Sequence, residues 1–169
     1  MTTTAPATTQ LALLRDCHRE KLTMRERHVA VARVTANYAF NNTYQYVINR
    51  DDLHLSWLEA AIADLGGAPD SVPAPVLPAN AGKPEVWRGL VSEDARAAGA
   101  FAERWRAQLT QITNARHRTM LELMCGETLE QKRFFEQMIA GRDDLLGRRA
   151  NGPGSPGTGD GVLGVRWIE

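Results

Sequence analysis

Residues 66–84 read GGAPDSVPAPVLPANAGKP, and this proline-rich stretch separates two long segments that contain no proline. Proline holds itself and the residue before it in extended conformations, so the stretch is not a floppy loop. At about 3 Å per residue it can run the full length of a helix bundle. A simple up-and-down bundle needs only short loops, so this connection predicts one long crossover over residues 66–90.

The segments on either side of the crossover are both expected to be helical hairpins. No proline or glycine occurs between Leu11 and Leu65, and only Gly99 and Gly126 interrupt the segment from Ser92 to Ala140. Each segment is too long for one ordinary helix. The fold class predicted is therefore all-α, a four-helix bundle of two hairpins that forms one domain over residues 9–149.

The turn within each hairpin is placed from local signals. In the first hairpin the turn lies between Thr35 and Thr43, where Asn41, Asn42 and Thr43 are typical turn residues. In the second, Gly126 suits the position after a helix end and Thr128 suits an N-cap. These signals predict helices near residues 8–36, 43–65, 92–125 and 128–147.

Composition excludes several classes of function. The chain has 169 residues, with 20 Lys and Arg against 20 Asp and Glu, and this balance argues against a nucleic-acid binder. No apolar run is long enough to span a membrane. Residues 1–8 are interpreted as a disordered leader rather than a signal peptide. Cys17 and Cys125 are therefore expected to be free thiols in a cytoplasmic protein.

Polar residues interrupt the apolar stripes of the first two predicted helices. Asp51 and His54 fall on the stripe of the second helix, and Glu20 and His28 on that of the first. Buried charged groups need partners. If the first turn centres near residue 36, Glu20 is level with Asp51 and His54, whereas a turn near residue 41 brings His28 there. A carboxylate and a histidine three residues apart on an inward face are an arrangement typical of di-iron bundles.

Residues 51–67, DDLHLSWLEAAIADLGG, resemble the second helix of ferritin-like and rubrerythrin-like proteins. That helix commonly carries an acidic residue, a histidine three positions later, a Trp-Leu pair and a terminal Leu-Gly-Gly. Glu20 precedes Asp51 by 31 positions, close to the spacing between the family's first two ligating carboxylates. The resemblance implies a ferritin-like bundle with Glu20, His28, Asp51 and His54 as candidate ligands for iron, zinc or manganese.

The second hairpin departs from the family pattern. Glu130 and Arg133 have the spacing of the second Glu-x-x-His motif, but arginine does not ligate a metal, and Glu103 falls off the apolar stripe. Three interpretations remain open: a hydrogen-bonded core network, a mononuclear metal site, and a complete di-iron site with ligands from a second chain. We expect the core network, with no cofactor.

The end of the chain combines a tether with an apolar peptide. Residues 150–161 are rich in Gly, Pro and Ser, as flexible linkers are. The segment 162–169, VLGVRWIE, would cost roughly 1.5–3 kcal/mol for each large side chain left in water. It is therefore predicted to dock onto a protein partner, the same bundle or a neighbouring subunit, through Val162, Leu163, Val165, Arg166, Trp167 and Ile168.

This peptide resembles the cargo-loading tails of proteins packaged in encapsulin shells, which carry a motif of the type leucine-glycine-isoleucine-arginine. The resemblance implies docking inside a protein compartment, where ferritin-like cargo is frequent. The function we expect is a non-catalytic ferritin-like bundle that acts as an interaction or structural protein. The alternative is a metal-dependent redox or iron-handling protein, of the di-iron oxidoreductase or ferroxidase type. Apolar surface near the first turn favours a homo-dimer.

Overall fold

The computed structural model describes residues 5–146, with side chains from residue 9 onward. It contains four α-helices, α1 (Ala5–Val34), α2 (Tyr38–Asp64), α3 (Pro84–Gln108) and α4 (Ala115–Ile139), and a short 3-10 helix, η1 (Leu109–Gln111). No strand occurs among the described residues, so the predicted all-α four-helix bundle is confirmed. Helix α1 begins at Ala5, so the prediction of a disordered leader over residues 1–8 is wrong for its last four residues. The predicted linker and tail at 150–169 lie outside the described residues.

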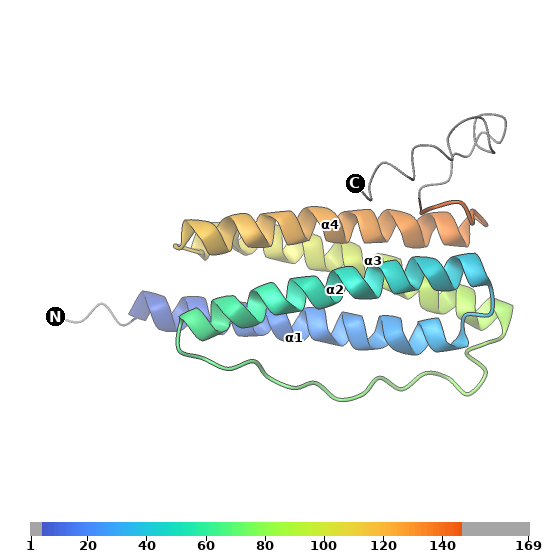
Figure 1. The fold of residues 1–169 in the computed structure, drawn as a ribbon, viewed down its shortest axis with the longest axis horizontal. Coiled ribbons are helices and arrows are strands. Elements are labelled where there is room, and N and C mark those ends of the chain that lie inside the picture. Colours follow the sequence, from blue (N-terminus) through green and yellow to red (C-terminus); the bar gives the residue numbers. More distant parts are fainter. Residues whose placement is uncertain (1–4, 147–169) are drawn as a thin grey trace, which may run out of the picture.

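The crossover runs the length of the bundle beside α1, as predicted (Figure 1). It makes α2 and α3 parallel, while α1 with α2 and α3 with α4 form antiparallel hairpins. Asp70 of the crossover forms ion pairs with Arg15 and Arg19, so two charges of α1 hold the extended chain against the bundle. The crossover is shorter than predicted, because Pro84 opens α3 in the first-turn position that proline favours.

The first turn lies at residues 35–37, inside the window that the sequence predicted. Asn37 is the N-cap of α2, and its side chain accepts a hydrogen bond from the backbone nitrogen of Phe40. The expected turn residues Asn41 and Asn42 lie within α2 instead. The Asn41 side chain donates to the carbonyl oxygen of Ala32, so it ties the two helices together across the turn.

The predicted second turn at residues 126–128 is wrong. The chain turns between Leu109 and Asn114, through η1, and the Asn114 side chain caps α4 by accepting from the backbone nitrogens of Arg116 and His117. Gly126 lies in the interior of α4, where a helix tolerates a glycine at a cost of about 1 kcal/mol. Helix α4 ends at Ile139 rather than near residue 147, and Gly141 follows with a left-handed φ of 84°.

Two apolar clusters fill the bundle, one toward each end. The first is built around Leu58, Phe101 and Met124, and the second around Val31, Tyr44 and Phe135. On α2 and α4 the residues between the clusters are polar and buried: Asp51, His54, Thr128 and Gln131. No helix in the described part of the chain is long and apolar enough to cross a membrane.

Candidate functional site

Lys21 lies at the centre of the bundle and is completely buried. Its ammonium nitrogen is 2.6 Å from Oδ1 of Asp51, which is also completely buried. Burial alone would raise the pKa of Asp51, but the ammonium of Lys21 and the imidazole of His28 hold that pKa well below its usual range. Asp51 is therefore a carboxylate throughout the physiological pH range.

The remaining donors and acceptors around this pair come from α4. The Lys21 ammonium donates to the Thr128 hydroxyl at 3.2 Å and to the Gln131 amide oxygen at 3.3 Å. The Gln131 amide nitrogen donates to Oδ1 of Asp51 at 2.9 Å. The ammonium also lies 5.2 Å from the centre of the Phe101 ring, within the range of a cation–π contact. The Lys21 ammonium of α1 is thus surrounded by side chains from each of the other three helices.

His28 contacts the second carboxylate oxygen of Asp51. Its Nδ1 atom is 2.7 Å from Oδ2 of Asp51, and its ring packs 5.2 Å from Phe135 and 6.1 Å from Tyr44. Lys21 and His28 lie seven residues apart on α1, two helical turns, so both face the same carboxylate. The structure therefore brings together two of the predicted site residues, Asp51 and His28. It adds Lys21 of α1, whose ammonium contacts α2 and α4.

His54 belongs to a second pair. Its Nε2 atom is 2.6 Å from Oε2 of Glu127 on α4, and Glu127 also lies 3.5 Å from Arg50. The Nδ1 atom of His54 is buried without a hydrogen-bond partner among the described residues. Burial and the nearby Lys21 charge lower the pKa of His54 to about 4, so its imidazole is neutral at pH 7.

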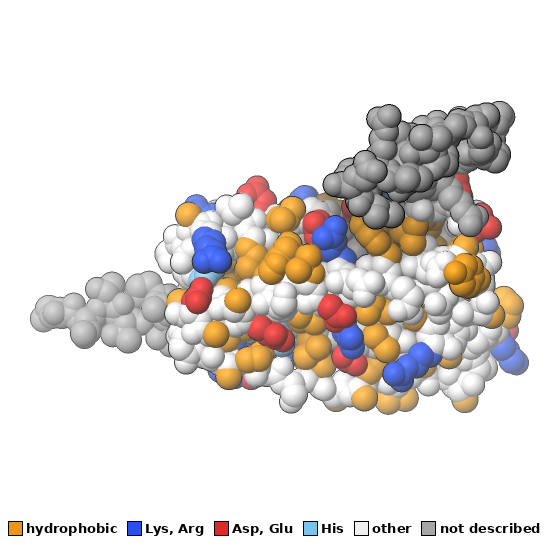
Figure 2. All heavy atoms as spheres, viewed as in Figure 1, with side chains coloured by type: hydrophobic (Ala, Val, Ile, Leu, Met, Phe, Trp, Pro, Cys, Tyr) orange, Lys and Arg blue, Asp and Glu red, His pale blue; other side chains and the backbone are white. Residues whose placement is uncertain are grey.

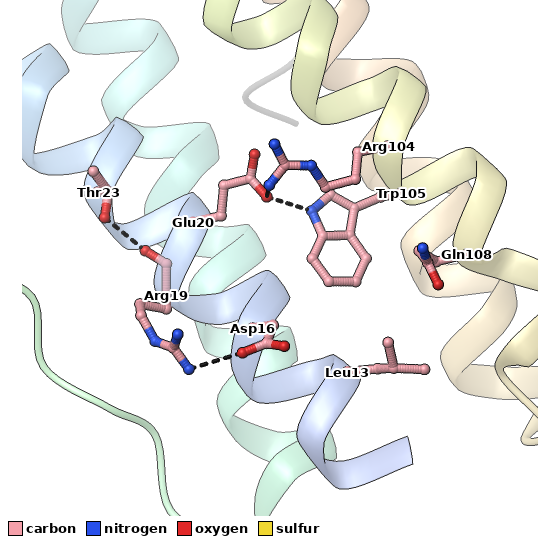
Figure 3. A pocket seen from close by; sticks show the side chains of 8 residues that line it. All are labelled: Leu13, Asp16, Arg19, Glu20, Thr23, Arg104, Trp105 and Gln108. Atoms are coloured by element: carbon pink, nitrogen blue, oxygen red, sulfur yellow. Dashed lines mark hydrogen bonds and ion pairs between the residues drawn. The ribbon is translucent and has the colours of Figure 1, made fainter. Parts of the chain in front are cut away.

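Glu20 does not join the core network, although the first turn centres near residue 36. It points toward α3, where Oε2 accepts from Nε1 of Trp105 at 2.9 Å and from Arg104 at 3.1 Å (Figure 3). There it lines an open surface pocket of about 420 Å³ between α1 and α3. The residue that occupies the predicted inward position is its neighbour, Lys21.

The residues around Asp51 do not fit a metal ion. Oδ1 of Asp51 is occupied by the Lys21 ammonium and the Gln131 amide, and Oδ2 by His28. A divalent ion at Asp51 would have to displace a charge that the fold itself supplies. Across residues 5–146 no group of three or more His, Cys, Asp and Glu side chains is placed to hold a metal ion.

A second buried carboxylate, which the sequence pattern did not single out, lies on α3. Asp94 accepts from Nε of Arg27 at 2.6 Å and from the hydroxyl of Tyr44 at 2.6 Å. Burial, together with the Asp94 charge, raises the pKa of Tyr44 well above its usual value. Asp94 thus joins α3 to both helices of the first hairpin. Its signal in the sequence is its position on the α3 stripe, between Val91 and Ala98.

The cysteines are as expected. Cys17 and Cys125 are free and buried, and burial raises the pKa of both thiols, that of Cys125 to about 11. Both thiols are therefore protonated at neutral pH. No protein-family model matches this chain, and no curated protein shows significant similarity to it.

Proposed function

We propose that this chain is a non-catalytic bundle of the ferritin-like kind that acts as an interaction or structural protein. The observation that carries the proposal is the Lys21–Asp51 pair. In a bundle with one long crossover, Asp51 stands where a metal-ligating carboxylate is expected, and the Lys21 ammonium supplies the positive charge there. With that charge built into the chain, the bundle needs no ion to complete its core.

The chemistry of the other candidate groups supports a structural role. His28, Gln131 and Thr128 are engaged with Asp51 or Lys21, and the buried thiols are protonated at neutral pH. Among the described residues, the buried side-chain nitrogen and oxygen atoms have hydrogen-bond partners, with the exception of Nε of Arg15 and of Nδ1 of His18 and His54. A satisfied buried network contributes to a unique core rather than to turnover of a substrate.

The test is elemental analysis of protein purified without a histidine tag, incubated with Fe²⁺, Zn²⁺ or Mn²⁺ and desalted. We expect far less than one metal equivalent per chain for the native protein. The comparison variants are Asp51→Asn and Asp52→Asn, the same substitution at a buried and at an exposed neighbouring position. One or more equivalents in the native protein, lost in Asp51→Asn and kept in Asp52→Asn, would overturn the proposal and support an iron-handling redox protein.

The partner side of the proposal rests on residues 162–169 as a docking peptide, and the resemblance to cargo-loading tails names an encapsulin shell as a receptor. Co-expression of the full chain, and of the chain ended at residue 161, with a shell protein tests this assignment. Co-elution of only the full chain with assembled shells supports the assignment. If neither the full chain nor the shortened chain elutes with the shells, the assignment is wrong. Light scattering on the full chain tests the expected homo-dimer.

A further inference from the structure

Exposed apolar side chains gather on one side of the bundle. Among the described residues, six large hydrophobic side chains are exposed, and three of them, Tyr46, Leu53 and Leu123, lie along the seam between α2 and α4. Two more, Tyr38 and Leu146, line a hollow where α2 begins and the described chain ends. Figure 2 shows hydrophobic surface on this face between scattered charges. Concentration of exposed apolar surface on one face marks a binding surface.

The α2/α4 seam is defined by pairs of residues that face each other across it. Tyr46 packs 5.8 Å from Phe134, and His54 lies 2.6 Å from Glu127. Leu53 lies one turn before Trp57 on α2, and Leu123 lies between Met120 and Glu127 on α4, so both leucines flank the seam. Beyond them the seam opens into a pocket of about 190 Å³, lined by Trp57, Ala60, Ala61, Asp64, Arg116, His117 and Met120.

The chain itself supplies a peptide that reaches this pocket. The described part ends at Leu146, at the same end of the bundle as the start of α2. From Ile139 back to Met120, α4 covers roughly 28 Å at 1.5 Å per residue. Residues 147–161 have the composition of a tether, with a typical span of about 20 Å and a maximum of about 50 Å. An extended peptide over 162–169 adds about 26 Å, so it can lie along the seam without stretching the linker.

Each charged side chain of the peptide also has side chains of opposite charge near the seam. Three carboxylates, Glu122, Glu127 and Glu130, line an open pocket on α4 together with Leu123, and Glu127 also contacts His54 and Arg50 of α2 across the seam. The peptide carries one positive side chain, Arg166, next to Trp167, and one negative side chain, Glu169. The pocket beyond Leu123 combines apolar walls with Asp64 and Arg116, which suits an indole whose N–H needs an acceptor. With Trp167 in the pocket, Arg166 is directed to these carboxylates and the Glu169 side chain to Arg116.

We propose that residues 162–169 dock on the α2/α4 seam of their own chain, with Trp167 in the pocket beside Trp57. This inference rests on the proposed docking function of the peptide and deepens it, because the bundle becomes the peptide's first receptor. An external receptor must then compete with the seam for the same side chains. The tether keeps the peptide at a high effective concentration near the seam. An external receptor therefore needs high affinity or a high local concentration to displace it.

The experiment is disulfide trapping in the full chain with Gly126→Cys and Gly164→Cys. Gly126 lines the same open pocket on α4 as Leu123 and Glu127, and nothing lies within 4 Å of an added Cβ atom, so the substitution is tolerated. Cys17 and Cys125 are buried with raised thiol pKa values and do not compete. The matched control pairs Gly164→Cys with Val76→Cys, an exposed position on the crossover, away from the seam.

We expect the seam pair to close within one chain at least about tenfold faster than the control pair, as a docked peptide exceeds the effective concentration of a free tether. Adding Leu123→Glu or Trp167→Ala to the seam pair should return its rate to that of the control. Equal rates for seam and control would overturn the inference. Cross-links between chains, at a rate that rises with protein concentration, would also overturn it and assign the seam to a second copy.

These outcomes are separable from a failure of the proposed function. If the seam pair closes no faster than the control while the full chain still enters shells, the docking peptide stands and only self-docking fails. If neither contact is found, the docking function of residues 162–169 fails as well. Metal content is measured on the same full chain and is independent of both results.

Discussion

The ammonium of Lys21 lies 2.6 Å from a carboxylate oxygen of Asp51, and both side chains are fully shielded from solvent. Removing two charges from water is costly, and the attraction between them offsets this cost only when every remaining donor and acceptor is satisfied. Here His28, Thr128 and Gln131 complete that shell. The pair thereby fixes how α1, α2 and α4 pack against one another.

Replacing Lys21 with methionine should destabilise the fold by about 3–5 kcal/mol, because Asp51 is left as a buried charge without its cation. The measurement is the free energy of unfolding from urea titration. The double variant Lys21→Met, Asp51→Asn should recover part of the loss, since it removes the unpaired charge. Lys132→Met, in an exposed pair with Glu136, is the control and should change stability by less than about 0.5 kcal/mol. A similar small effect of Lys21→Met would contradict the buried ion pair.

Stability should fall as the pH is lowered from about 6.5 to 4, because His54 stays neutral in the fold and binds a proton when the chain unfolds. The folded pKa of about 4 lies below the usual value near 6.5, so the contribution of His54 is complete above pH 6.5. When this contribution of His54 is fully lost, the free energy of unfolding is lower by about 3 kcal/mol. Urea titrations of the native protein and of His54→Leu at pH 7.5, 6 and 5 measure it. The slope should flatten in the variant, and equal slopes would show that another group titrates.

Asp51 should add a separate loss at lower pH. Its pKa is lowered in the folded state, so its stabilising contribution is complete above the usual pKa of an aspartate, near 4, and is lost as the pH falls further. Acid titration followed by far-ultraviolet circular dichroism should show unfolding below about pH 4. In the double variant Lys21→Met, Asp51→Asn the free energy of unfolding should fall less steeply as the pH drops below about 4, since the titrating carboxylate is gone. An unchanged pH dependence would assign acid unfolding to other carboxylates.

Gly126→Ala should stabilise the protein by about 0.5–1 kcal/mol, because alanine favours a helix interior and the position is open to solvent. Gly141→Ala should instead destabilise it, because Gly141 has a left-handed φ of 84° that alanine adopts poorly. Thermal unfolding of both variants compares the two glycines directly. Destabilisation by Gly126→Ala would return the turn to the position that the sequence indicated.

Tyr44→Phe should cost about 1–3 kcal/mol, because it removes a hydroxyl that donates to the buried carboxylate of Asp94. The exposed Tyr38 provides the control, and Tyr38→Phe should have almost no effect on the unfolding free energy. If both substitutions were neutral, the Arg27 guanidinium alone would suffice to satisfy Asp94.

Part of the candidate site was predictable. The sequence placed His28, Asp51 and His54 in the core, and all three are buried. The inward position assigned to Glu20 belongs to Lys21, one residue along, in the stripe Leu14, Cys17, Lys21, Met24, His28 and Val31. That stripe follows alternating steps of three and four, but a lysine on it reads as a solvated side chain, because single-sequence patterns favour charge at the surface.

The sequence by itself determined the class of fold, since the prolines of residues 66–83 exclude a helix there and the absence of proline within the flanking segments allows two long hairpins. It also fixed which α2 face is buried, through spacings of three and four. Only the tertiary structure decided the turn at residues 109–114 and the partners of each buried charge. A capping asparagine and a mid-helix glycine differ by only about 1 kcal/mol in local preference, and packing between helices outweighs that difference. Whether a carboxylate meets a lysine or a metal depends on the rotation of α1 against α2 and α4, which no local pattern records.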